Sequence, residues 1–265
     1  MSGYGDFSQF YDRLMTDVDY DGYADYLLSL FEKFGGKRPR TVLDVACGSG
    51  SLCEAFVKRG VDPIGIDASE EMLFAAHEKP LLQQHDVMLL QQDMRELDLY
   101  GTSDGAVCVL DSLNHLRDTA DVARVLRRLR LFVEPGGLFI FDVNTPYKHR
   151  EVLGNNAFVF EEEDFVCVWR NRYVPKTCTV DMLLDFFVET ETGEYERLTD
   201  TVRERAYTRA TWEKLLADTG WDPLAVFAHK TTEEPTDTCE RWVFVARNNR
   251  TVEEATFKGD NIYYG

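Results

Sequence analysis

Short apolar runs alternate with segments of helical periodicity over residues 41–143. Each run is rich in Val, Ile and Leu, and several of them end in Gly, Asp or Ser. Parallel strands that are buried on both faces carry such continuous runs, and each needs a crossover to reach the next strand. The alternation therefore predicts an α/β fold, in which an open, mostly parallel sheet has helices on both faces. We expect strands at residues 41–46, 63–67, 87–91, 105–110 and 138–143, and helices at 51–59, from 69 onward and at 118–132.

The pattern changes between residues 157 and 205. Four strand-like runs follow one another there, with turn signals at Asp164, at Pro175-Lys176 and at Thr192-Gly193. Runs joined by short turns of this kind are typical of antiparallel hairpins. We therefore predict an antiparallel β meander that is inserted into the α/β fold. The first pattern returns with a helix at residues 211–219 and strands at 222–228 and 241–247.

These patterns divide the chain into four parts. The first is an N-terminal helical cap, with helical periodicity over residues 7–34. The others are the α/β domain, the inserted β subdomain on the substrate side, and a polar tail that we expect to be loose. In chain order the cap covers residues 1–36, the α/β domain 37–154 and 206–247, the insert 155–205 and the tail 248–265.

A glycine-rich turn follows the first predicted strand, in the sequence Asp44-Val-Ala-Cys-Gly-Ser-Gly. Small residues at the carboxyl end of a strand let a ligand approach the backbone. A dinucleotide fingerprint would require a third glycine, but the chain has Cys53 at that position. Asp44 lies inside the strand, where a carboxylate suits a ligand that carries an ammonium group.

Two further acids follow the next two predicted strands. Asp67 ends the second strand, and an acid in that position can accept hydrogen bonds from both ribose hydroxyls of an adenosine ligand. Asp93 follows the third strand, where it suits the amino group of an adenine with Met94 packed on the ring. Three acids at successive strand ends, behind a glycine-rich turn, predict one nucleoside-binding site.

These motifs, taken in order, resemble those of the class I S-adenosylmethionine-dependent methyltransferases over residues 40–145. More narrowly, the chain resembles a bacterial subfamily whose members carry a small antiparallel β insert. The resemblance implies a Rossmann-like, seven-stranded sheet whose last strand is antiparallel. It also implies S-adenosylmethionine as cofactor and S-adenosylhomocysteine as product, but no particular substrate. The narrower resemblance depends on three segments: Phe10-Tyr-Asp-Arg-Leu-Met, Asp111-Ser-Leu-Asn-His-Leu and Asp142-Val-Asn-Thr-Pro-Tyr.

The resemblance also implies roles for individual residues. Asp44 and Leu110 are expected near the methionine portion of the cofactor, Asp67 at the ribose, and Asp93 at the adenine edge. Cys47 departs from the wider family, in which glycine is commoner at that position. The full set of expected cofactor-binding residues is Tyr11, Asp44, Ala46, Gly48, Gly50, Asp67, Ala68, Met72, Asp93, Met94 and Leu110.

Charge and composition argue against several other classes of protein. The formal net charge is −18, which argues against a protein that binds nucleic acid by covering phosphates with Lys and Arg. The sequence shows neither a signal peptide nor an apolar run of about 18 residues, so we expect a cytoplasmic protein without membrane association. The five His residues lack metal-ligand spacing, and we expect no metal site.

The sequence therefore predicts an enzyme that transfers a methyl group, by in-line displacement, to a small-molecule acceptor. The insert's aromatic residues could wall the acceptor pocket, form the core of the insert or make a homodimer contact. Three alternatives stay open: an RNA methyltransferase acting on tRNA, a non-catalytic protein that binds the cofactor and a partner, and an NAD(P)-dependent oxidoreductase. The candidate catalytic residues on the substrate side are Tyr11, Asn114, His115 and Asn144.

Overall fold

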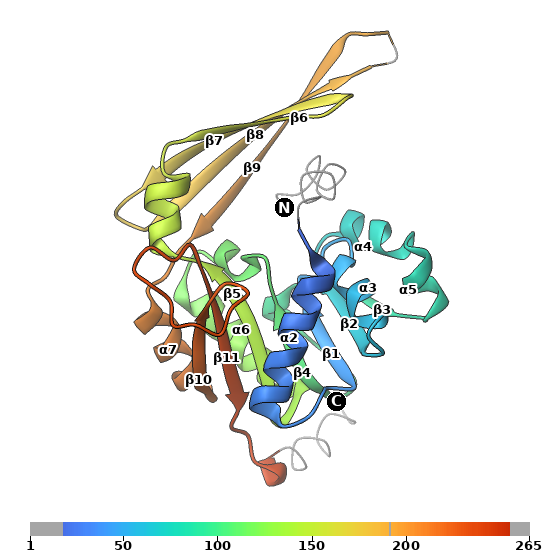
Figure 1. Cartoon of the computed structure of the whole chain (residues 1–265), viewed down its shortest axis with the longest axis vertical. Helices are drawn as coiled ribbons and strands as arrows, with labels where there is room; N and C mark the ends of the chain where they lie inside the picture. Colours follow the sequence, from blue (N-terminus) through green and yellow to red (C-terminus); the bar gives the residue numbers. More distant parts are fainter. Residues whose placement is uncertain (1–17, 191, 255–265) are drawn as a thin grey trace.

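The computed structural model describes residues 18–190 and 192–254, in which two β-sheets dominate (Figure 1). Sheet A has seven strands in the order β10-β11-β5-β4-β1-β2-β3. Sheet B has four strands in the order β6-β7-β8-β9, and it projects from one end of the sheet A layer (Figure 1). The strands of sheet A are β1 (Thr41–Val45), β2 (Asp62–Asp67), β3 (Met88–Gln91), β4 (Ser103–Cys108), β5 (Val133–Asn144), β10 (Trp221–Ala228) and β11 (Arg241–Asn248).

The first five strands of sheet A are parallel, whereas β11 pairs antiparallel with both β5 and β10. The chain order reverses beside β1, because β2 lies on one side of this strand and β4 on the other. Ligands of open α/β sheets bind beyond the carboxyl ends of the strands at such a reversal. The predicted seven-stranded, mostly parallel sheet with an antiparallel last strand is confirmed.

Helices cover both faces of sheet A, as the sequence predicted. Alternate residues of the central strands point to opposite faces, so that Phe139 and Phe141 pack with α6 and α7, while Leu138 and Ile140 pack with α2. Figure 1 shows α2 lying across the sheet near β1 and β4. The helical segments are α2 (Tyr20–Gly35), α3 (Ser51–Val57), α4 (Glu70–His77), α5 (Pro80–Gln84), η1 (Met94–Glu96), η2 (Ser112–His115), α6 (Thr119–Phe132), η3 (Lys148–Leu153) and α7 (Arg209–Asp218).

Capping residues explain where several of these helices begin. The side chain of Asp19 accepts a hydrogen bond from the backbone N–H of Gly22 at the start of α2. Ser69, the expected first residue of a helix, caps α4 by accepting the N–H of Met72 at 3.2 Å. Each cap satisfies a backbone donor that the first helical turn would otherwise leave unpaired. The helix expected over 7–34 begins at Tyr20 within the described residues, since Val18 and Asp19 are not helical, and residues 7–17 lie outside the described part of the chain.

Three local features differ from what the sequence suggests. Residues 134–137, Glu-Pro-Gly-Gly, are typical of a turn, but they belong to β5, where they form an irregularity in the pairing with β4. The tail is not loose at its start, because Asn248 is buried and donates hydrogen bonds to the carbonyls of Arg130 and Val133. A π-helical segment, η3, connects β5 to sheet B, and no periodicity signal had indicated it.

Sheet B is the antiparallel meander that the sequence predicted. One face is apolar and includes Phe165, Met182 and Phe186, while the other carries arginines that pair with Asp181 and Asp185. This alternation is the period-two pattern of a sheet with one packed and one solvated face. Its strands are β6 (Ala157–Glu161), β7 (Phe165–Val174), β8 (Thr179–Glu189) and β9 (Tyr195–Arg205).

Gly105 of β4 lies where helix α2 approaches the sheet closely. A Cβ added there would lie 2.3 Å from Cε1 of Phe31 and 2.8 Å from the carbonyl oxygen of Leu138. We expect Gly105→Ala to lower the free energy of unfolding by about 1–3 kcal/mol, because the added methyl must displace α2. Chemical denaturation measures the change, with Gly101→Ala as control, since among the described residues no atom beyond its chain neighbours lies within 4 Å of that Cβ position. Equal stability of the two variants would contradict the expectation.

No helix within residues 18–190 and 192–254 is both long enough and apolar enough to span a membrane.

Candidate functional site

A cavity of about 610 Å³ lies between the carboxyl ends of the sheet A strands and the apolar face of sheet B. Its volume is within the range of small-molecule sites. A second cavity, of about 20 Å³, shares Ala46, Leu110 and Ser112 with the first and adjoins it beside β1. The sequence had predicted a site at these strand ends, and it had left open whether the aromatic residues of the insert wall this site, form the core of the insert or make a homodimer contact.

The turn after β1 presents backbone groups to the large cavity. Ala46 and Gly48 both line it, and both have a positive φ angle, of 60° and 55°. The N–H of Gly48 donates to Oδ2 of Asp67 at 2.8 Å, and the N–H of Cys47 donates to the carbonyl of Ile66. The glycine-rich turn is therefore attached to the end of β2, which places Asp67 beside it.

Asp67 is held on the cavity wall by backbone donors. Besides the bond from Gly48, its Oδ1 accepts the N–H of Ser69 at 2.9 Å. Burial raises the pKa of this carboxyl group, although these backbone N–H groups act in the opposite direction. An ionised carboxylate has about four acceptor positions, so Asp67 can also accept hydrogen bonds from a ligand. Ala68 and Met72 line the cavity next to it.

Asp93 and Met94 line the same cavity at the end of β3. The Asp93 carboxylate accepts the backbone N–H of Arg95 at 2.9 Å and forms an ion pair with its guanidinium. The hydrogen bonds from Arg95 lower the pKa of Asp93 despite partial burial. Arg95 in turn reaches Asp121 of α6 at 3.3 Å. Asp93 is therefore an ionised, fixed acceptor at the far end of the cavity from β5.

Asp44 lines only the smaller cavity and is 1% exposed. Burial raises its pKa to about 7, although the Cys53 thiol, which donates to Oδ2 at 3.3 Å, acts in the opposite direction. Gly50, another expected cofactor residue, lines neither cavity. It precedes α3 with a φ of 76°, and a Cβ there would lie 2.8 Å from Cδ1 of Leu82. Packing against Leu82 therefore explains why a glycine stands at position 50.

The four candidate catalytic residues fall in different places. Tyr11 lies outside the described residues. Asn114 is fully buried and lines neither cavity, because its side chain connects the backbone of Asn144 to the carbonyl of Arg205. His115 and Asn144 both line the large cavity. Leu110, expected near the cofactor, lines both cavities.

A cluster of charged side chains lines the large cavity. Asp111, Lys148, Glu204 and Arg241 all line it, and they come from four separate elements or loops. Arg241 Nη2 donates to Asp111 Oδ1 at 2.7 Å. Burial alone would raise the pKa of Asp111, but the Arg241 guanidinium holds it well below its usual value. The cluster therefore contains ionised groups that have little contact with water.

Asn144 connects three members of this cluster by hydrogen bonds. Its Nδ2 donates to Asp111 Oδ2 and to Glu204 Oε2, both at 2.9 Å, and its Oδ1 accepts from Lys148 Nζ at 3.0 Å. Glu204 also contacts Nε2 of the buried His149 at 3.2 Å. Because Glu204 belongs to β9, these bonds also connect sheet B to the end of β5.

Asp142 contacts the charged cluster but does not line the large cavity. It is fully buried, forms an ion pair with Arg241 and accepts the hydroxyl of Tyr23. It also accepts the backbone N–H groups of Leu110 and Asp111, at 2.9 and 2.8 Å. Leu110 and Asp111 both have left-handed φ angles, of 55° and 57°, which non-glycine residues rarely adopt. Asp142 therefore stabilises a strained turn on the cavity wall.

Comparison with known proteins assigns the chain to a family. The model of the methyltransferase domain family matches residues 42–137. A protein of Geobacillus sp. (strain WCH70) whose name classes it as a methyltransferase is 31% identical over 244 residues, which cover 92% of this chain and 99% of the relative. A crystal structure of an S-adenosylmethionine-dependent methyltransferase from Clostridium acetobutylicum ATCC 824 covers 93% of this chain and 99% of its own, with a TM-score of 0.82 and 28% identity. The chain belongs to the S-adenosylmethionine-dependent methyltransferases.

A second full-length relative agrees with this assignment. The methyltransferase-named YqeM of Bacillus subtilis (strain 168) is 32% identical over 251 residues, which cover 94% of this chain and 98% of YqeM. The resemblance stated from the motifs is thus confirmed, and with it the enzyme class and S-adenosylmethionine as cofactor. The acceptor is not identified by these relatives.

Sequence reasoning missed much of this methyltransferase's charged cluster. Asp111 and Asp142 occur in the motifs that carried the resemblance, so their presence was visible but their partnership was not. Lys148, Glu204 and Arg241 stand in segments without any local signature. Only the pairing of β11 with β5, and the return of β9 to the end of β5, brings them together. In the part of the methyltransferase that the structure describes, no group of three or more His, Cys, Asp or Glu side chains is arranged to hold a metal ion.

Proposed function

We propose that this enzyme binds S-adenosylmethionine along the strand ends of sheet A and a small-molecule acceptor between the charged cluster and sheet B. One observation carries the proposal: the Asp67 carboxylate and the turn at Gly48 share a wall of the 610 Å³ cavity, whose opposite wall belongs to sheet B. A single cavity that reaches both walls can hold two reactants side by side. The insert is therefore proposed as the acceptor-side subdomain.

The residues on the first wall fit the proposed cofactor. Asp67 has acceptor capacity for two ribose hydroxyls, and the backbone at Ala46 and Gly48 has no bulky side chain that would hinder a close approach. Met72 and Met94 supply apolar contact for an adenine ring, between Ala68 and Asp93. Asp44, in the adjoining small cavity, would accept hydrogen bonds from the ammonium group of the methionine portion, next to Leu110.

The protein's task in this reaction is alignment rather than activation. The bound cofactor supplies a methyl group on a sulfonium, which is already electrophilic. Holding the acceptor in line at near-attack distance can contribute on the order of 7–11 kcal/mol. The apolar side chains of sheet B, with Leu153 of η3, would exclude water from the acceptor half of the cavity. A small-molecule acceptor suits the volume of the site, about 610 Å³.

The names of partial relatives support a small-molecule acceptor. A ubiquinone biosynthesis O-methyltransferase of Alkalilimnicola ehrlichii is 37% identical over 108 residues, which cover 40% of this chain. A Streptomyces venezuelae N,N-dimethyltransferase named for a dTDP-amino sugar is 31% identical over 102 residues, which cover 38%. Both names describe small molecules, one methylated on oxygen and the other on nitrogen. Since each match covers less than half of the chain, the choice of acceptor atom must come from this protein's own site.

Asp67→Ala tests the proposed cofactor site. We expect its affinity for S-adenosylhomocysteine to fall by about 100-fold, because two charge-assisted hydrogen bonds are lost. Isothermal titration calorimetry measures the change. Asp62→Ala is the matched control, since Asp62 is exposed at the opposite end of the same strand and should leave the affinity unchanged. Wild-type protein that binds neither S-adenosylmethionine nor S-adenosylhomocysteine would overturn the proposed function.

A further inference from the structure

Lys148 occupies a distinctive position on the acceptor side of the cavity. It is the first residue of η3, the segment that leads from β5 to sheet B, and it lines the cavity between the cofactor wall and the sheet B wall. Its Nζ donates to Asn144 Oδ1 at 3.0 Å. A lysine ammonium has three donors and no acceptor. Within the described residues, this bond accounts for one donor, so two remain for a ligand in the cavity.

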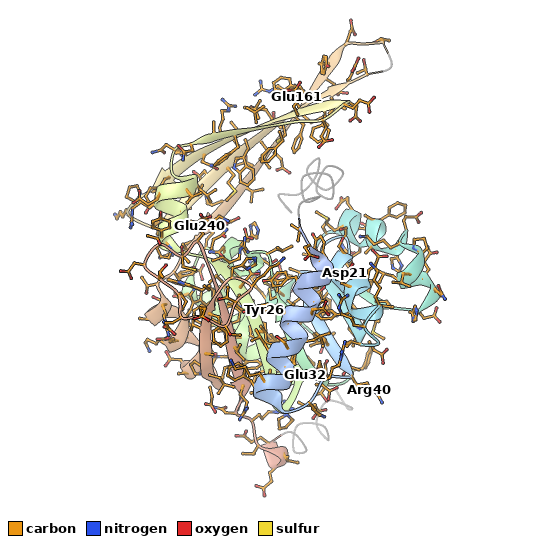
Figure 2. All side chains as sticks on the ribbon, in the orientation of Figure 1. Asp21, Tyr26, Glu32, Arg40, Glu161 and Glu240 are labelled. Carbon is orange, nitrogen blue, oxygen red and sulfur yellow. The ribbon has the colours of Figure 1, made fainter. Side chains whose placement is uncertain are left out.

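Charged groups from several elements surround this amine. Glu204 of β9 and Asp111 of the loop after β4 favour its charged form, and so does Glu240, which Figure 2 shows near the junction of the two sheets. Burial has the larger effect and acts in the opposite direction, as does Arg241 of β11. The net result is a lowered pKa for Lys148, so that its neutral form is more accessible than in an ordinary lysine. His149, next in the chain, faces Glu204 instead.

The acceptor half of the cavity is otherwise apolar. Phe160, Trp169, Met182, Leu184 and Val202 of sheet B line it, opposite the charged cluster. The Trp169 indole N–H donates to Asn171 Oδ1 at 2.6 Å, which holds the ring on this wall. Apolar and aromatic side chains of this kind suit a flat, apolar ligand body, with its polar part directed at the cluster.

We propose that Lys148 is the catalytic base for the acceptor, and that the acceptor carries an acidic hydroxyl, a phenol or an enol, on an apolar ring system. This inference deepens the proposed function and depends on it. In its neutral form Lys148 has a lone pair that can accept the hydroxyl proton, and in its protonated form it can donate a hydrogen bond to the resulting oxyanion. Both oxygens of Asp111 are already engaged by Arg241 and Asn144, so this carboxylate has no oxygen left over to take a proton from a protonated amine.

The proposed reaction is a proton transfer coupled to a displacement at the methyl carbon. The hydroxyl O–H bond breaks, and its proton goes to the neutral Nζ of Lys148. The acceptor oxygen then forms a bond to the methyl carbon while the carbon–sulfur bond breaks, and that bond's electron pair stays on sulfur. The products are a methyl ether, S-adenosylhomocysteine and a protonated Lys148, which returns its proton to water. A positioned base of this type contributes roughly 10²–10⁴-fold to a rate.

The test uses 4-nitrophenol, a phenol whose ionisation is visible by absorbance, with protein saturated by S-adenosylhomocysteine. We expect bound 4-nitrophenol at pH 6 to show about a tenfold higher ratio of phenolate to phenol than the free compound, because an adjacent ammonium stabilises the phenolate. Lys148→Met should abolish this increase. Lys214→Met is the matched control, since Lys214 is exposed on α7 and pairs with Asp218. Its spectrum should match that of the wild type.

The outcomes distinguish a failure of the proposed function from a failure of the proposal about Lys148 and the hydroxyl acceptor. S-adenosylhomocysteine binding is measured first by calorimetry, and its absence in the wild type overturns the proposed function. If S-adenosylhomocysteine binds but 4-nitrophenol does not, or if benzylamine binds more tightly, the hydroxyl acceptor is overturned. A phenolate signal that persists in Lys148→Met overturns the role of Lys148. Retained S-adenosylhomocysteine binding shows that the variant is folded, and Lys148→Gln replaces it if that binding is lost.

Discussion

Asp142→Ala is expected to lower the free energy of unfolding by about 3–5 kcal/mol. The aspartate is fully buried, and its removal would leave the guanidinium of Arg241 and the hydroxyl of Tyr23 without this partner. Breaking one side of a buried ion pair is costly because the remaining charge stays out of water. The backbone N–H groups of Leu110 and Asp111 would also lose their acceptor, so the strained turn would relax.

Denaturation with urea measures this loss, and Asp98→Ala is its control. Asp98 is 84% exposed, so its removal should change the stability by less than about 0.5 kcal/mol. We also expect Asp142→Ala to weaken binding of S-adenosylhomocysteine, because the backbone at Leu110 lines both cavities. A loss of stability below about 1 kcal/mol would show that the buried network is not a main support of the fold.

Asp44→Asn is expected to stabilise the ligand-free protein at pH 8 by about 2–4 kcal/mol. The pKa of Asp44 is raised to about 7 by burial, while an unfolded aspartate ionises near pH 4. Between these values the unfolded chain releases the proton and the folded chain keeps it, so this group lowers stability progressively as the pH rises. Above pH 7 the penalty is complete and constant. Asparagine has no such penalty, because it does not ionise.

The measurement is the stability difference between Asp44→Asn and wild type, followed from pH 5 to pH 8 without ligand. This difference should grow in favour of the variant as the pH rises. Asp62→Asn, exposed on the neighbouring strand, should show no such growth. The same Asp44→Asn variant should bind S-adenosylmethionine at least tenfold more weakly at pH 8, since an ammonium partner is lost. A stability difference that does not change with pH would mean that burial does not raise the pKa of Asp44.

The α/β layer could be predicted because its determinants are local. Continuous apolar runs such as the one at Val42 and Leu43 are needed for strands buried on both faces, and Ser69 marks a helix start by its own side chain. The placement of Asp67 and Asp93 in one cavity could also be predicted, because parallel strands end at a common edge. Asp44 lies inside β1 and lines the smaller cavity, and the packing of Gly50 against Leu82 depends on α5.

The acceptor side could not be predicted in this way. Lys148 lies in a π-helical segment without a periodic signal, and Glu204 and Arg241 are ordinary charged residues in strand sequences. Asn114 was expected near the substrate because it lies in a motif after β4. The structure instead uses its amide to join the backbone of Asn144 to Arg205. Sequence distance hides such pairings, because nothing local to either partner specifies the other.

The sequence by itself determined the α/β sheet, the inserted meander and the strand-end acids, because periodicity, turn residues and the order of motifs are encoded within short segments. The tertiary structure alone decided that sheet B closes the cavity and that Asp111, Lys148, Glu204 and Arg241 meet in it. These residues meet because antiparallel pairing of β11 with β5, and the return of β9 to the end of β5, join segments that lie far apart in the chain. Burial then gives the assembled groups the altered proton affinities that none of them has in an extended chain.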